Sequence, residues 1–380
     1  MFQPLLAVWR GPWYKKLVLI VSILIASVFP VHRNFDHGLG MFQYSRHEAF
    51  MDGKSPFFNP WQYRVFCPYL VEGTRWVYDH TVDKVIPLES VLHLESHATI
   101  EGPSDAFKEV TSSKDGLITT MIYAGYRVLF NIFIYLFAFC IFAYYTRNKW
   151  LNMLGIFLVS LAMGNGVYNA DLSLNTYVDL TLFLWMACLV LYKGNAWWIL
   201  PITIIGILNR ETALLIPGLY FVAAAVYPAN KKGLLGISWL HTPAVRTWVI
   251  TAVSLVAFFA IFIAIRMHYG FRPTGMVEET GMHFGWDLIK FNTTGRYGVQ
   301  TIIEMYGVLG FLPLAWLFCF RHLSMLLRVW SVLLLPCWIG LHFVSTQAGE
   351  SRYYLVTLIL VLIPMVFEMI NRSEKRLATT

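Results

Sequence analysis

The chain has 380 residues, of which 57% are hydrophobic, 16% aromatic and only 13% charged, with a formal net charge of +7. A mean hydropathy of +0.56 exceeds what a soluble domain of this size needs, so the composition predicts a polytopic membrane protein. The basic residues stand beside apolar runs, where membrane lipid and topology explain them better than nucleic acid, which we exclude as a partner. The five cysteines include no Cys-x-x-Cys pair and predict no disulfide framework.

Ten apolar segments predict an all-α fold of about ten transmembrane helices, which together make 1–380 a single integral membrane domain. The segments are 13–31, 118–145, 150–165, 172–192, 196–208, 212–227, 247–267, 300–320, 325–344 and 353–370. A spanning helix needs about 20 apolar residues, and 196–208 falls short of that length. No small-residue cleavage site follows 13–31, so we expect this first segment to be an uncleaved anchor.

The placement of lysine and arginine predicts which loops lie inside the cell. If the N-terminus is cytoplasmic, every inside loop carries Lys or Arg, as the positive-inside rule requires. Both termini are then cytoplasmic, and the large 32–117 loop after the first helix is external. Within this loop, 60–80 alternates aromatic and charged residues, which is typical of a helix lying in the membrane interface. The remaining helices fall into 118–230 and the C-terminal 231–380.

The external loop begins with a polar segment that can carry chemistry. Asp36 closely follows the first apolar run. The features that come after it are Tyr44, Glu48 and Ala49 on a helix-like piece, Gly53, Pro56, the pair Tyr63-Arg64, and Pro68. A carboxylate at this position can act as a general base that takes a proton from an attacking hydroxyl group. The other interpretation is an ordinary surface acid at the end of a helix.

Two further polar elements interrupt apolar sequence on the predicted outer side. Arg210 and Glu211 separate 196–208 from 212–227, and charges there are costly unless they are paired or used. The planar fork of an arginine suits phosphate, although a structural Arg–Glu pair is the alternative. Arg352 opens the last apolar segment, where it could hold a lipid phosphate or extend to the interface.

Other charged residues inside the apolar sequence allow two interpretations. Arg127 and Asn131 lie one turn apart, and Asp171 and Asp179 flank the fourth segment. They could neutralise one another or line a substrate site, and the sequence does not separate these options. His93, Glu95 and His97 favour a strand-like alternation over a metal site. We therefore expect no cofactor, with a divalent metal as the open alternative.

The order of residues in 32–68, with Asn209-Arg210-Glu211 before Pro217, resembles the GT-C superfamily of membrane glycosyltransferases. The resemblance covers 1–230, so that 118–230 is the remainder of the GT-C-like module, and 349–354 matches more weakly. It implies inverting transfer of a sugar from a polyprenyl-phosphate carrier to a glycan, lipid or protein acceptor. The implied reaction occurs on the periplasmic or luminal face, with a bacterial inner membrane as the expected location.

The resemblance also implies roles for individual residues. Asp36 would be the general base. Substrate binding would fall to Arg210, Glu211, Arg64, Arg352, Tyr44 and Asp171. Many members of the superfamily have two adjacent acids where this chain has Asp36-His37, so a second acid would have to come from elsewhere, with Asp171 and Glu211 as candidates.

Two functions from other classes also fit a polytopic membrane protein. One is a transporter or flippase of a lipid-linked or small polar substrate, in which charges within the membrane line a path. Transporters usually contain two similar halves with interrupted helices, and no internal repeat is visible here. The other is a non-catalytic subunit of a membrane complex. A soluble nucleotide-sugar site has no support, because the sequence contains no Gly-rich phosphate loop.

Overall fold

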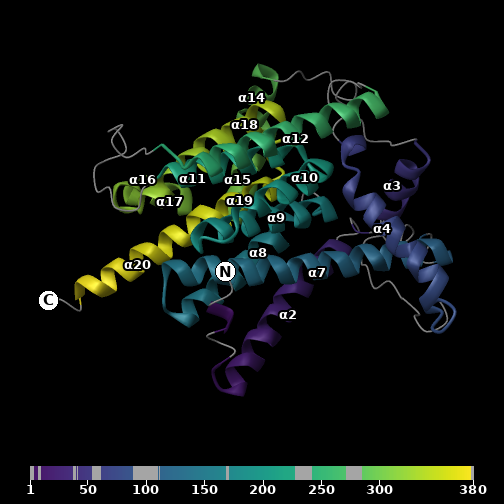
Figure 1. The fold of residues 1–380 in the computed structure, drawn as a ribbon, viewed down its shortest axis with the longest axis horizontal. Coiled ribbons are helices and arrows are strands. Elements are labelled where there is room, and N and C mark those ends of the chain that lie inside the picture. The colour runs from purple at the N-terminus through teal and green to yellow at the C-terminus, as the bar shows by residue number, and fades with distance from the viewer. Residues whose placement is uncertain are drawn as a thin grey trace.

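The computed structural model describes residues 4–6, 10–36, 40, 42–53, 61–88, 110, 112–167, 171–226, 242–270 and 285–377. The elements formed by these residues are helices, as the all-α prediction requires (Figure 1). Six helical stretches are long and apolar enough to cross a membrane. They are α2 (Trp13–Asp36), α7 (Lys114–Tyr145), α9 (Leu174–Leu191), α12 (Val245–Tyr269), Met325–Ser345 and Ser351–Lys375. These lengths and compositions indicate an integral membrane protein.

The predicted count of ten spans stays a prediction. The described residues of all ten apolar segments are largely helical, but four segments do not meet the length and hydropathy expected of a single unbroken span. They contain α8 (Lys149–Gly166), α10 (Ile199–Asn209), α11 (Leu215–Ala225), and the pair α15 (Gly295–Leu309) and α16 (Leu312–Cys319). The last pair is bent by 70° at Gly310, whose φ of +55° suits a glycine, and it counts as a seventh span if taken as one.

The other helices complete the described chain. They are α3 (Phe42–Met51), α4 (Phe66–Val77), α14 (Trp286–Thr293), α17 (Met325–Val332), α18 (Trp338–Ser345), α19 (Leu355–Thr357) and α20 (Ile363–Leu377), with 3-10 turns at Trp61–Tyr63, Ala196–Trp198, Glu211–Leu214, Phe320–His322 and Ser351–Tyr354. Three π-helical stretches, Tyr78–Val82, Leu333–Cys337 and Leu358–Leu362, continue α4, α17 and α19. The helix expected within 60–80 therefore forms, and its position relative to a bilayer stays a prediction.

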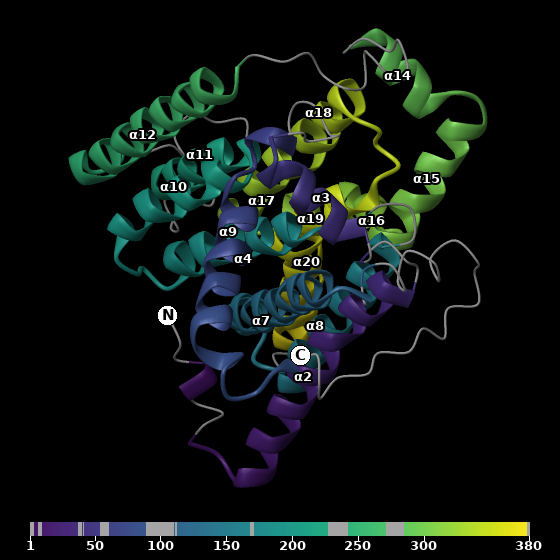
Figure 2. The ribbon, with the colours of Figure 1, turned by 90° about the vertical axis from the view of Figure 1, so that its right-hand side faces the viewer.

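The centre of the molecule is α7, which runs through it with α2 crossing on one side and α9 to α12 on the other (Figure 1). At 32 residues α7 is about 48 Å long, more than the ~30 Å hydrocarbon core, so one end must project beyond it. The helices α3 and α4 lie at the end of the molecule opposite the C-terminus (Figures 1 and 2). They come from the loop predicted to be external, and they cover the end of the bundle where the predicted site residues gather.

Small residues and buried polar groups bring the helices close together. A Cβ atom added at Gly164 of α8 would lie 2.5 Å from the ring of Phe29 on α2, so only glycine permits this contact. Ser160 of α8 donates a hydrogen bond of 3.0 Å to the carbonyl of Ala26, and Asn131 of α7 donates one of 2.8 Å to that of Ser27. Such contacts are typical of helix packing in membranes, where backbones approach closely.

Candidate functional site

The site is built around the break between α10 and α11. The helix α10 ends at Asn209, because Arg210 has an extended backbone (φ −159°, ψ 147°). The amide of Asn209 fixes this break against the first turn of α9: its Nδ2 donates to the carbonyl of Asn175 (2.8 Å), and its Oδ1 accepts from the Asn175 side chain (3.0 Å). These bonds satisfy polar groups that would be costly among apolar helices.

Arg210 points from this break toward α9 and is 5% exposed. Its Nη1 lies 3.7 Å from Asp179, and its Nη2 donates to the hydroxyl of Thr176 at 3.0 Å. Thr212 also donates to Asp179, with 3.1 and 3.2 Å to the two carboxylate oxygens. The Nε of Arg210 is buried and has no hydrogen-bond partner among the described residues. The Nη atoms of Arg210 are therefore held by Asp179 and Thr176, while its Nε remains available as a hydrogen-bond donor.

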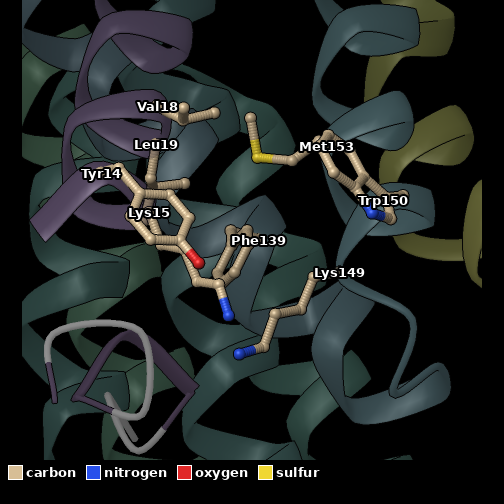
Figure 3. Close-up of a pocket in the computed structure, with 8 residues that line it drawn as sticks. All are labelled: Tyr14, Lys15, Val18, Leu19, Phe139, Lys149, Trp150 and Met153. Carbon is tan, nitrogen blue, oxygen red and sulfur yellow. The ribbon is translucent and has the colours of Figure 1, made fainter. Parts of the chain in front are cut away.

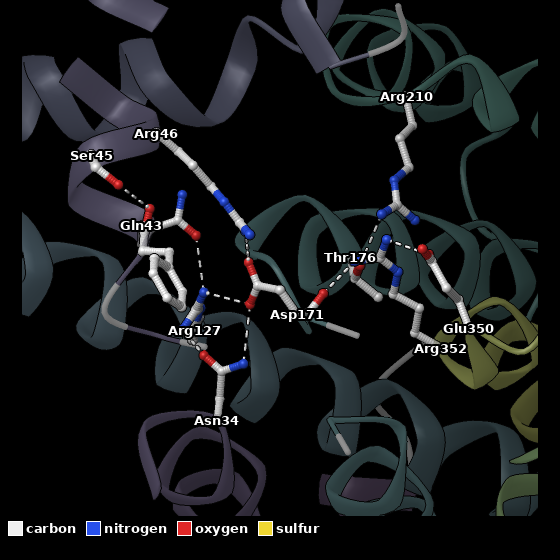
Figure 4. Close-up of polar contacts among 11 residues, drawn as sticks. Asn34, Gln43, Ser45, Arg46, Arg127, Asp171, Thr176, Arg210, Glu350 and Arg352 are labelled. Atoms are coloured by element: carbon white, nitrogen blue, oxygen red, sulfur yellow. Dashed lines mark hydrogen bonds and ion pairs between the residues drawn. The ribbon is translucent and has the colours of Figure 1, made fainter. Parts of the chain in front are cut away.

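Arg352 reaches the same region from the start of the last long helical stretch. Its Nη1 donates to the main-chain carbonyl of Asp171, and its Nη2 donates to the carboxylate of Glu350 (Figure 4). Burial favours the neutral form of Glu350, but the charge of Arg352, the hydrogen bonds of Tyr353 and Arg352, and the charge of Arg210 together outweigh it and hold the pKa of this carboxyl below its ordinary value. Glu350 therefore stays ionised and fixes the direction of Arg352.

Arg64 approaches the other two arginines from the loop that is predicted to be external. It follows the 3-10 turn Trp61–Tyr63 and is partly buried. Burial, together with the positive charges of Arg210 and Arg352, lowers the pKa of Arg64 to about 10. Like charges have this effect only when they lie near one another. We call Arg64, Arg210 and Arg352 the arginine cluster.

A fourth arginine and three carboxylates surround this cluster. Arg266, in the last turn of α12, donates to Glu211 at 3.1 Å. Its guanidinium also lies 4.4 Å from the centroid of the Tyr63 ring, a cation–π contact. The three carboxylates belong to Asp179, Glu211 and Glu350, which pair with Arg210, Arg266 and Arg352. The site therefore concentrates guanidinium groups, which suit the oxygens of an anion such as phosphate.

A second group of polar residues, the Asp171 network, adjoins the cluster. Asp171 is 7% exposed and precedes α9. Its Oδ1 accepts from Asn34 (3.1 Å) and lies 3.4 Å from Arg127, while its Oδ2 accepts from Arg46. Arg127 also donates to Gln43 at 3.0 Å (Figure 4). Because two arginines and an amide occupy both oxygens, this carboxylate is suited to hold other residues in position rather than to take a proton.

Asp36 and Tyr44 lie apart from the cluster. Asp36 is the last residue of α2, its side chain is 50% exposed, and its ion pair within the described ranges is with Arg33 at 3.7 Å. Tyr44, on α3, donates a hydrogen bond to Glu48, and burial together with this bond raises the pKa of Tyr44 to about 12. Neither side chain makes a direct contact with the arginine cluster. Asp36 is nevertheless only two residues from Asn34 of the Asp171 network.

The structure thus joins five of the seven predicted site residues: Arg64, Arg210, Glu211, Arg352 and Asp171. It pairs Arg127 with Asp171 and Arg210 with Asp179, which corresponds to mutual neutralisation of those charges. The residues that the sequence prediction missed are Asn34, Gln43, Arg46 and Arg266. Arg266 had a usable signal, because it is a charged residue in the last turn of a long apolar run.

Among the residues that the structure describes, no group of three or more His, Cys, Asp or Glu side chains could hold a metal ion. The residues His93, Glu95 and His97 lie outside those ranges. The expectation of no cofactor therefore stays a prediction. What the described site offers a ligand is guanidinium groups and buried hydrogen-bond donors.

No protein-family model, curated protein or solved structure matches this chain. The likeness of 32–68 and 209–217 to the GT-C superfamily thus stays an expectation from motifs. The contacts of Arg210 and Arg352 with the start of α9 are independent of that likeness, because they follow from the arrangement of the helices.

Proposed function

We propose that this protein is an inverting glycosyltransferase that takes a sugar from a polyprenyl-phosphate carrier. The observation that carries the proposal is the arginine cluster: Arg210 and Arg352, far apart in the sequence, both donate to the stretch 171–176 at the start of α9, and their charges act on Arg64. Neighbouring guanidinium groups repel one another, and a bound anion relieves that repulsion. Arginine is also the side chain best suited to grip two oxygens of a phosphate.

The donor phosphate would bind at the arginine cluster with its polyprenyl tail among the helices. In the reaction, a hydroxyl oxygen of the acceptor forms a bond to the anomeric carbon while the bond from that carbon to the phosphate oxygen breaks. The electron pair leaves with the phosphate, and Arg210 and Arg352 stabilise its added negative charge. One displacement of this kind inverts the configuration at the anomeric carbon.

Asp36 is the proposed base for the proton of the acceptor hydroxyl. Its side chain is half exposed, whereas both oxygens of Asp171 are occupied by cations and an amide. An accessible carboxylate can receive a proton from an incoming acceptor, and a saturated one has no free lone pair in that direction. Asp171 is instead proposed to hold Arg352, Arg46 and Arg127 in place.

The proposal includes the finer topology. The chain would cross the membrane about ten times, with both termini in the cytoplasm and the site on the outer face of a bacterial inner membrane. The acceptor would be a glycan, a lipid or a protein, and no cofactor or nucleic acid would take part.

The first experiment tests the donor site without needing an acceptor. Purified protein in nanodiscs is heated with polyprenyl phosphate or with polyprenol of the same length. Phosphate recognition predicts that only polyprenyl phosphate raises the unfolding temperature, since a ligand that binds the folded state stabilises it. Equal protection by the two compounds would show that the tail alone is recognised, and the proposal would fail.

The second experiment tests turnover. The protein is incubated with a panel of polyprenyl-phosphate hexoses in water, which acts as a slow substitute acceptor. Release of a sugar with inverted anomeric configuration, followed by NMR, is expected for at least one donor. Retention of configuration would rule out the single displacement. Release that is unchanged in a protein lacking Arg210 would rule out the arginine cluster as the donor site.

A further inference from the structure

A cavity of about 230 Å³ opens between the N-terminal part of α2, the C-terminal part of α7 and the first turn of α8 (Figure 3). Its wall is apolar and includes Val18 and Leu19 of α2, Phe139 of α7 and Met153 of α8. These four side chains carry no hydrogen-bond donor, and the polar groups of the lining belong to Tyr14, Lys15, Lys149 and Trp150. The apolar part of the wall fits a hydrocarbon chain, which needs only apolar contacts.

The mouth of this cavity is positively charged. Lys15 and Lys149 line it from different helices, are both exposed, and extend their ammonium groups toward one another (Figure 3). Neither lysine forms an ion pair with a carboxylate in the part of the chain that the structure describes. Lys15 has a weaker contact with the ring of Tyr14, 5.8 Å from its centroid. Two facing ammonium groups repel each other unless an anion lies between them.

We infer that this cavity binds an anionic phospholipid, with an acyl chain on the apolar wall and the headgroup phosphate between Lys15 and Lys149. The two lysines match a negative phosphate, and the wall directly below them matches a hydrocarbon chain. A free phosphate ion would leave that wall uncovered, and a zwitterionic lipid would leave the lysine charges uncompensated. Trp150, also at the cavity, is an amphipathic residue of the kind that favours the headgroup level.

This lipid would be distinct from the proposed sugar donor. The cavity contacts α7 at Phe139, whereas the Asp171 network contacts α7 at Arg127. At 1.5 Å per residue these positions are about 18 Å apart along the helix axis. The inference therefore does not depend on glycosyl transfer. It assigns a structural lipid to the end of the bundle that the basic residues predict to be cytoplasmic.

Native mass spectrometry of the protein, equilibrated with equal amounts of phosphatidylglycerol and phosphatidylcholine, tests the inference. The wild type is expected to retain phosphatidylglycerol preferentially. Replacing both lysines, K15Q/K149Q, should reduce that preference by roughly tenfold or more, since each Lys near a membrane surface contributes on the order of a fivefold preference for anionic lipid. A second variant, M153W, keeps both lysines but fills the cavity, and it should lose the bound lipid as well.

The matched control is K193Q/K375Q, which removes two lysines predicted to be on the same face but away from the cavity. This control should retain phosphatidylglycerol as the wild type does. An unchanged preference in K15Q/K149Q would overturn the inference, as would equal losses in the control. A further experiment compares the unfolding temperature of the protein with added inorganic phosphate and with added phosphatidylglycerol. Protection by phosphate as strong as protection by phosphatidylglycerol would show an anion site rather than a lipid site.

Discussion

Arg210 has both a structural and a proposed functional role, and its contacts allow the two to be separated. On one side it neutralises Asp179, a buried carboxylate at 3.7 Å. Its Nε is buried without a partner among the described residues, and Arg210 belongs to the arginine cluster. Removing Arg210 alone would therefore remove a binding group and also leave Asp179 buried and unpaired.

A pair of variants distinguishes these roles. Arg210→Ala should lower the free energy of unfolding by about 3–5 kcal/mol, because it leaves a buried charge uncompensated. Arg210→Ala combined with Asp179→Asn should recover most of that loss, because the buried acid is gone as well. The affinity for polyprenyl phosphate should stay reduced by roughly 10- to 100-fold in both proteins. Wild-type affinity in the double variant would exclude Arg210 from phosphate binding.

Two exposed acids, Asp36 at the end of α2 and Asp52 directly after α3, make opposite predictions. Asp36→Asn keeps the shape of the side chain but removes the base, so sugar transfer should drop by roughly 10²–10⁴-fold while polyprenyl phosphate still binds. Radiolabelled sugar transfer at saturating donor measures this effect. Asp52→Asn, which changes another exposed acid of the same loop, is the matched control and should retain full activity. Full activity in Asp36→Asn would leave the proposed reaction without its base.

At the level of single residues, the sequence alone identified charged residues whose immediate neighbours in the chain are apolar. Arg210, Glu211 and Arg352 could be singled out because each interrupts or borders an apolar run. Asn34 and Arg46 could not, because their significance comes from Asp171, which lies 137 and 125 residues further along the chain. Spacing within one segment contains no information about a partner at that distance, so the Asp171 network required the fold.

Among the elements, the α10–α11 hairpin determines where the site lies. The stretches Ala196–Asn209 and Glu211–Ala225 are both shorter than a membrane span. At 1.5 Å per residue each is about 21–23 Å long, against a hydrocarbon core of ~30 Å. The sequence indicated this shortness for 196–208. It did not indicate the 70° bend within 300–320, because hydropathy contains no information about the change of helix direction at Gly310.

The hairpin depends on a close approach at Gly206. A Cβ atom added there would lie 2.5 Å from the Cβ of Ala213, so a larger side chain must push the break between α10 and α11 open. Gly206→Val should destabilise the protein by about 1–3 kcal/mol and weaken binding of polyprenyl phosphate by displacing Arg210. Thermal unfolding and the nanodisc binding experiment measure the two effects.

Gly218 provides the matched control on α11. Nothing lies within 4 Å of a Cβ added at that glycine, so Gly218→Ala should leave stability unchanged or raise it by up to about 1 kcal/mol. Binding should also be unaffected. If Gly206→Val unfolded no more easily than Gly218→Ala, the packing of the hairpin would not be what holds Arg210.

For the whole molecule, the distribution of charge predicts an orientation. The arginine cluster, the Asp171 network and α3 gather at one end, and the lysines of the lipid cavity lie toward the other. The positive-inside rule, applied to the Lys and Arg of the loops, predicts that the end with Lys15 and Lys149 is cytoplasmic. In the described part of the chain, six or seven helical stretches are long and apolar enough to span a membrane. Since an even and an odd number of spans place the C-terminus on different sides, the orientation needs a direct measurement.

Cysteine labelling provides that measurement. Single cysteines at Ser112 and Thr379, introduced after the five native cysteines are replaced, should react with a membrane-impermeant maleimide from opposite sides. The Ser112→Cys protein should be labelled in intact spheroplasts, and the Thr379→Cys protein only after the membrane is opened. Labelling of both positions from the same side would refute the predicted topology.

Asp171 connects the arginine cluster to α3, because it contacts an arginine of each. Its main-chain carbonyl holds Arg352, and its carboxylate holds Arg46 of α3. A ligand that binds Arg352 more tightly when this arrangement is intact must, by thermodynamic linkage, stabilise the docked position of α3 to the same extent. Hydrogen exchange of α3 with and without polyprenyl phosphate would reveal this coupling as slower exchange, and identical rates would show that α3 and the phosphate site are energetically independent.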